Sequence, residues 1–153
     1  MRSVNQWLDD YGDSHRNRTN KLLHWICVPV IVWCVIALLW SLPTTADVPA
    51  VLNWAVLAVA AALAYYTMLS PPLALGALAL LIAMLLSIFL IERAGMGPVW
   101  RIGTILFVLA WIGQFIGHHI EGKRPSFLKD IQFLLIGPLW LLASLYRRFG
   151  IRY

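Results

Sequence analysis

The stretch PVWRIGTILFVLAWIGQFIG, residues 98–117, decides the class of fold. Its single charged side chain is Arg101, near its start. A helix of about 20 apolar residues is long enough to cross a hydrocarbon core roughly 30 Å thick. Because lipid offers the backbone no hydrogen-bond partner, a helix is the conformation expected for such a stretch. The sequence therefore predicts a membrane-spanning helix here.

The composition of the whole chain agrees with a membrane protein. Of its 153 residues, 61% are hydrophobic and only 12% are charged, whereas about 25% are charged in soluble domains. The net charge of +5 comes from Lys and Arg gathered in short polar segments, which favours membrane orientation over nucleic-acid binding. We expect a single integral membrane domain, 1–153, with a polar cytoplasmic segment (1–21), a helical bundle (22–146) and a basic tail (147–153).

Four further apolar stretches complete the expected bundle: 22–42, 50–69, 72–91 and 131–146. The first three are long enough to span a membrane. The last is shorter and contains Pro138, which interrupts helical hydrogen bonding; a kinked span, a re-entrant hairpin and an interfacial helix are all open. The predicted fold class is all-α, a polytopic membrane bundle with four spanning helices and a fifth helix of one of these kinds.

The distribution of Lys and Arg predicts the orientation of the bundle. Basic residues precede 22–42, follow 98–117 and close the chain: Arg16, Arg18, Lys21, Lys123, Arg124, Lys129, Arg147, Arg148 and Arg152. Segment 43–49 has none. Positively charged loops stay on the cytoplasmic side, so we expect the N-terminus inside and a fifth stretch that does not cross fully. Arg93 and Arg101 then lie outside. A bacterial inner membrane or an ER-like membrane is the expected location.

This topology places all four histidines at the cytoplasmic face: His15, His24, His118 and His119. Helical spacing puts Asn20 and His24 on one face, and Gln114, His118 and Glu121 on another. Polar groups at this depth normally face the bundle interior or a wet cavity. We therefore expect these two faces to meet.

Several imidazoles beside a carboxylate are typical of a transition-metal site. Imidazole binds Fe, Zn, Cu and Ni, and two histidines with one carboxylate leave open positions on non-haem Fe(II). Asn20 and Gln114 are candidates to orient the ligand rings. His119 points about 100° away from His118 and is either part of the same cavity or an interfacial residue. A zinc-dependent membrane lipid hydrolase, a b-type haem protein and a non-enzymatic lipid-binding or scaffolding protein stay open as alternatives.

Two motifs carry a resemblance to a known family. YGDSHRNRTNKLLHWICVP, 11–29, spaces His15, Asn20 and His24 ahead of a proline, and GQFIGHHIEGKRPSF, 113–127, holds a Gln-x-x-Gly-His-x-x-Glu pattern. Together and in this order they resemble the membrane 2-hydroxy fatty acid dioxygenase family over essentially the whole chain. Cys27 stands where that family is expected to have glycine.

The resemblance implies an Fe(II)-dependent dioxygenase of fatty acid alpha-oxidation, which acts on a long-chain 2-hydroxy fatty acid with O2 and gives a fatty acid one carbon shorter. The implied metal ligands are His15, His24 and His118, with His119 or Glu121 as a fourth. The implied catalytic residues are His15, His24, His118 and Glu121. Asn20 and Gln114 are the implied orienting residues, and Lys123 or Arg124 is expected to offset the charge of the substrate carboxylate. Membrane lipid is a further expected partner, and the oligomeric state is open, a homo-oligomer included.

Overall fold

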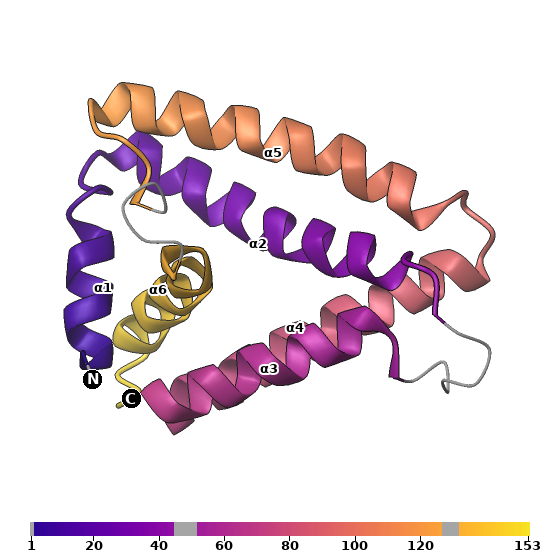
Figure 1. Cartoon of the computed structure of the whole chain (residues 1–153). Coiled ribbons are helices and arrows are strands. Elements are labelled where there is room, and N and C mark those ends of the chain that lie inside the picture. Colours follow the sequence, from indigo (N-terminus) through magenta and orange to yellow (C-terminus); the bar gives the residue numbers. More distant parts are fainter. Residues whose placement is uncertain (1, 45–51, 127–131) are drawn as a thin grey trace.

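Figure 1 shows the computed structural model of the chain, which describes residues 2–44, 52–126 and 132–153. The start of the 50–69 stretch, residue 131 and Lys129 lie outside the described residues. The described residues form six helices and no strand, so the expected all-α class is confirmed. The helices are α1 (Val4–Gly12), α2 (Arg18–Trp40), α3 (Trp54–Leu69), α4 (Pro71–Arg93), α5 (Val99–Glu121) and α6 (Phe133–Arg148).

Two helix pairs make up the body of the molecule. α2 packs along α5, and α3 packs along α4. In Figure 1 these pairs lie close at one end and diverge toward the other. α1 and α6 pack against each other at the diverging end, where both chain termini also lie.

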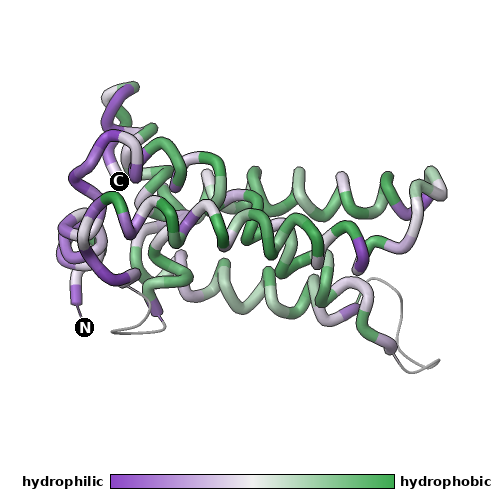
Figure 2. The backbone as a smooth tube through the Cα atoms, turned by 90° about the horizontal axis from the view of Figure 1, so that it is seen from above, coloured by the Kyte–Doolittle hydropathy of each residue, from purple (hydrophilic) through white to green (hydrophobic). Residues whose placement is uncertain are grey.

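The apolar length of each helix decides which helices can cross a membrane. Figure 2 shows hydrophobic residues along the middle of the bundle and hydrophilic residues gathered at the end with the termini. Among the described residues, three helices are long and apolar enough to span: α2, α4 and α5, each of 23 residues. α3 has 16 residues, about 24 Å of helix, and is shorter than the core of roughly 30 Å. The predicted fourth span therefore stays a prediction.

The fifth apolar stretch forms one helix, α6, and not a hairpin. Its 16 residues include Pro138 inside the helix. Ile136, Leu139 and Ala143 are fully buried, and α6 contacts α1, α2 and α4. α6 is therefore part of the bundle core, and by its length it is not one of the candidate spans.

α1 falls inside the segment that the sequence alone presents only as polar. It begins with a capping box, in which Gln6 N donates to Ser3 Oγ at 3.3 Å and Ser3 N donates to Gln6 Oε1 at 2.9 Å. Its buried side chains include Trp7, whose ring meets that of Phe133 edge to face at 5.2 Å. This packing anchors α1 to α6 and so holds the loop that leads into α2.

Glycines on α5 allow it to approach α2 closely. A Cβ at Gly113 would lie 2.7 Å from Cys27 Sγ, and a Cβ at Gly117 would overlap the Asn20 side chain. Small residues at a helix crossing let the two backbones come near each other in a membrane. This close crossing sets the separation of the helices that carry His24 and His118.

Candidate metal centre

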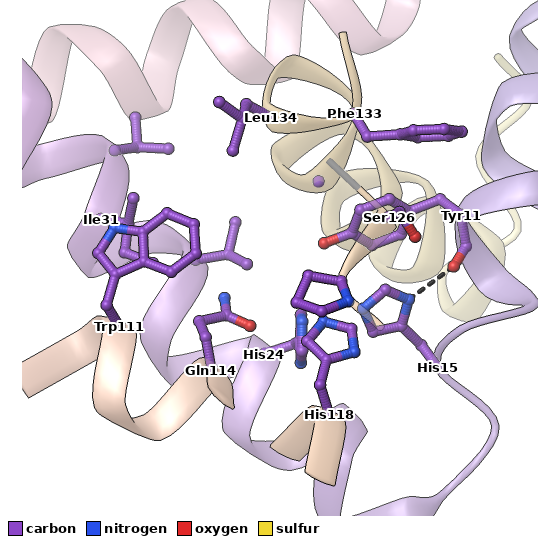
Figure 3. Close-up of a pocket in the computed structure, with 14 residues that line it drawn as sticks. Tyr11, His15, His24, Ile31, Trp111, Gln114, His118, Ser126, Phe133 and Leu134 are labelled. Atoms are coloured by element: carbon purple, nitrogen blue, oxygen red, sulfur yellow. Dashed lines mark hydrogen bonds between the residues drawn. The ribbon is translucent and has the colours of Figure 1, made fainter. Parts of the chain in front are cut away.

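Three histidines from separate parts of the chain converge at the end of the bundle that carries the termini. His15 comes from the loop between α1 and α2, His24 from the start of α2 and His118 from the end of α5. Their side chains are buried, and one potential ligand nitrogen from each lies within 4.8 Å of the others. The ring centroids are 4.1, 4.9 and 5.1 Å apart. Figure 3 shows the three rings grouped at one side of a pocket.

Backbone carbonyls orient two of these rings. His15 Nδ1 lies 2.6 Å from the Tyr11 carbonyl oxygen, and His24 Nδ1 lies 2.9 Å from that of Asn20. Because a carbonyl oxygen only accepts, each Nδ1 carries the proton and each Nε2 presents its lone pair. Metal-binding histidines are commonly held in this way.

Burial keeps His15 in the form that binds a metal. Removal from water disfavours the imidazolium and lowers the pKa of His15 to about 4, although the hydrogen bond to Tyr11 acts in the opposite direction. The Tyr11 ring stacks on His15 at 4.2 Å, and Trp140 lies 5.4 Å away. Burial also raises the pKa of Tyr11. His15 is therefore a neutral imidazole at neutral pH, ready to donate a lone pair.

The donor set fits a transition metal. His15 Nε2 and His118 Nδ1 are buried and have no hydrogen-bond partner among the described residues. An unpaired buried polar atom costs about 1–3 kcal/mol, and bonding to a metal would remove that cost. Three neutral imidazoles suit iron and zinc. The rings lie edge to face, at 68–88° to one another.

Glu121 lies outside this cluster and fastens the α1–α2 loop instead. Its carboxylate accepts hydrogen bonds from Arg16 N at 2.9 Å, Asn17 N at 2.8 Å and Asn20 Nδ2 at 3.1 Å. Asn20 Nδ2 also donates to the Ser14 carbonyl at 3.1 Å. Hydrogen bonds to an ionised acceptor are stronger than neutral ones. Glu121 and Asn20 thus tie the end of α5 to the loop that supplies the first histidine.

We expect Glu121→Gln to loosen the α1–α2 loop without unfolding the bundle. Glutamine offers one acceptor oxygen and no charge to three donors, so the stability should fall by about 1 kcal/mol. Hydrogen-exchange mass spectrometry in detergent should show faster exchange in peptides covering Arg16 and Asn17. Glu92→Gln is the matched control, because among the described residues the Glu92 carboxylate accepts only from Trp40 Nε1. Unchanged exchange in Glu121→Gln would show that the carboxylate does not hold the loop.

Of the other predicted site residues, the structure brings Gln114 to the pocket and leaves His119, Lys123 and Arg124 outside it. Gln114 is buried and lines the pocket, and its Oε1 has no partner among the described residues. His119 is exposed and outside the cluster, because one step along a helix turns a side chain by about 100°. Lys123 Nζ donates to the Asp13 carbonyl at 2.6 Å, and Arg124 is exposed. His119, Lys123 and Arg124 are therefore not brought to the pocket.

The cavity beside the histidines also includes residues that the sequence analysis did not single out. It measures about 60 Å³, and Tyr11, Pro125, Ser126 and Phe133 form part of its wall. Ser126 is buried, and its Oγ has no partner among the described residues. Two signals in the sequence point to them: Tyr11 lies four residues before His15, and Ser126 lies inside the second motif, directly after Pro125.

The chain is similar to known proteins over most of its length. The family model described as 2-hydroxy-palmitic acid dioxygenase Mpo1-like matches residues 1–149. The 2-hydroxy-palmitic acid dioxygenase MPO1 of Saccharomyces cerevisiae is 29% identical over 143 residues, which are 92% of this chain and 78% of the yeast protein. No solved structure matches the chain. The matched range contains all three clustered histidines.

Proposed function

This chain belongs to the Mpo1-like family of 2-hydroxy-palmitic acid dioxygenases, and we propose that it holds Fe(II) on three buried histidines and oxidises long-chain 2-hydroxy fatty acids with O2. The observation that carries this proposal is the convergence of His15, His24 and His118. The yeast relative is a 2-hydroxy-palmitic acid dioxygenase, and its name indicates the substrate class and the co-substrate. When bound, Fe(II) supplies the redox chemistry that makes O2 an effective oxidant.

The proposed reaction balances with O2 as the only oxidant. One 2-hydroxy acid and one O2 give a fatty acid one carbon shorter, CO2 and water. The bond between C1 and C2 breaks, C2 is oxidised from the alcohol to a carboxyl group, and C1 leaves as CO2. O2 takes up all the electrons that the acid releases.

Two buried polar side chains are suited to orient the acid. Gln114 Oε1 and Ser126 Oγ lie on the wall of the histidine pocket and lack partners among the described residues. In the proposed pose, the Gln114 amide oxygen accepts from the 2-hydroxyl group and the Ser126 hydroxyl donates to the carboxylate. These residues take the role first expected of Lys123 or Arg124, which do not line the pocket. Figure 3 shows Gln114 beside His118 on the wall of the pocket.

Aromatic side chains shield the proposed reaction from water. Tyr11 and Phe133 are buried and line the histidine pocket. Water exclusion strengthens the polar contacts inside the pocket. The ring of Tyr11 also stacks on His15, so the same side chain orients a ligand and closes the wall.

The helix order supports four membrane passes. α2 begins and α5 ends at the same histidine cluster. The intervening α3 must therefore bring the chain back to the side of the cluster before α4 crosses to the other side again. We place the cluster and both termini on the cytoplasmic side, because the basic residues of the chain ends favour that side. The expected membrane is a bacterial inner membrane or an ER-like membrane.

Metal analysis combined with an oxidation assay tests this function. Protein purified in detergent without oxygen should contain about one iron per chain, as expected for a single three-histidine site. It should consume O2 with 2-hydroxy palmitic acid and release the shorter acid and CO2. Zinc that persists after iron reconstitution, with no O2 consumption, would contradict the proposal and favour the zinc-dependent lipid hydrolase. Protein that binds no metal at all would favour a non-enzymatic lipid-binding role.

A further inference from the structure

We infer that a second, apolar cavity binds the acyl chain of the substrate and that its depth selects the chain length. The cavity measures about 450 Å³ and is lined by residues of α2, α3, α4, α5 and α6 together with Gln132. None of the described residues that line it carries a charged side chain. The inference rests on the proposed function for the chemistry at the head of the chain, but the cavity itself is a feature of the fold.

The apolar cavity adjoins the histidine pocket. Ile31, Val32, Trp111 and Leu134 line both spaces. Figure 3 shows Ile31, Trp111 and Leu134 on the side of the pocket away from His15. An acid with its carboxylate near the histidines would therefore extend its tail between these side chains into the second cavity.

The histidine pocket and the apolar cavity together have the length and the direction that a long acyl chain requires. Along α2 the wall of the apolar cavity continues through Val35 to Leu39, and the rise from His24 to Leu39 is about 22 Å. This distance is comparable with the extended length of a palmitoyl chain. α3 runs antiparallel to α2 (Figure 1), so Ala58 lies near the far end and Ala62 lies one turn closer to the histidines.

The Tyr66 hydroxyl in the wall already has a partner within the protein. The Tyr66 hydroxyl donates to the Leu135 carbonyl at 2.9 Å, so this hydrogen bond lies within the protein. An apolar space of this kind favours an apolar chain, because burying apolar surface away from water stabilises binding. An ordinary membrane lipid can also lie against these helices. Only a chain whose head group lies at the histidines would contact the side chains that line both cavities.

Filling the cavity at two depths tests the inference. Ala62→Leu and Ala58→Leu add bulk to its wall, whereas Ala61→Leu makes the same change at an exposed position of α3. The readout is kcat/KM for a series of saturated 2-hydroxy acids from short to long. Ala62→Leu should lower the value for 2-hydroxy palmitic acid by about tenfold or more and move the optimum to shorter chains. Ala58→Leu should move it less, and Ala61→Leu should keep the wild-type profile.

Photolabelling separates failure of this inference from failure of the proposed function. The probe is 2-hydroxy palmitic acid with a diazirine near the end of its chain, and mass spectrometry maps the cross-links. Labels should fall near Leu39 and Ala58, and Ala62→Leu should remove them. Such labels in a protein that oxidises no 2-hydroxy acid would leave the acyl site standing and overturn the reaction. An active enzyme with unchanged chain-length profiles, or with labels spread over the outer helix faces, would overturn the acyl site.

Discussion

We expect His118→Ala to lose bound metal and O2-dependent turnover together, with activity reduced by more than about a hundredfold. Changing residues that merely support metal ligands costs about 10–100-fold, so loss of a ligand should cost more. His118 contributes one of the three grouped nitrogens, and alanine cannot replace it. Metal content and O2 uptake, measured on the same anaerobic preparation, check this result.

His119→Ala is the matched control for this prediction. The two histidines are neighbours on α5, but His118 is buried in the cluster whereas His119 is exposed. A surface substitution usually changes stability by less than about 0.5 kcal/mol, so metal content and activity should stay close to the wild type. If both variants retain metal, or if His119→Ala alone loses it, the ligand set proposed for this protein is wrong. Comparable thermal stability of the two variants would separate loss of metal from loss of fold.

We expect Gly117→Ala to destabilise the protein by about 1–3 kcal/mol, as overpacking of a close contact usually does. The added Cβ would overlap the side chain of Asn20, which is fully buried and hydrogen-bonded to the Ser14 carbonyl and Glu121. α5 would have to move away from α2, and His118 would move with it. Thermal unfolding in detergent should show a lower Tm, and metal affinity should fall as well.

Gly103→Ala on the same helix is the control. A Cβ there would meet that of Ala37 at 3.4 Å, which is close but tolerable. Alanine also has a higher intrinsic helix propensity than glycine, by about 1 kcal/mol, so this variant should be near neutral or more stable. A Tm for Gly117→Ala equal to or above that of Gly103→Ala would show that the α2–α5 crossing does not depend on the missing side chain.

The sequence alone was sufficient for the fold class and for part of the candidate site. Long apolar stretches predict helices in a membrane because lipid leaves the backbone no other partner. Helical spacing placed Asn20 with His24, and Gln114 with His118, because these pairs repeat at about one turn. The distribution of Lys and Arg then predicted that both pairs lie at the same face of the membrane. These are local properties, so they can be derived from neighbouring residues.

The sequence did not reveal α1 or the role of its last turn. The capping box of Ser3 and Gln6 is a readable signal, but whether a short helix persists depends on what it packs against. Here α6 supplies the partner, more than a hundred residues later in the chain. The carbonyl of Tyr11 that orients His15 could not be assigned before that packing was known.

The tertiary structure decided what each polar residue near the cluster does. Glu121 bonds Arg16 and Asn17 across a separation of more than a hundred residues, and this pairing makes it a support for the loop, not a member of the cluster. The rotation of α5 about its axis, set by the glycine contacts with α2, turns His118 inward and leaves His119 exposed. The sequence by itself determined that a membrane helix ends in imidazoles. Only the packing of α1, α2 and α5 determined which imidazoles meet, because that choice depends on contacts between distant segments and not on the order of residues along any one helix.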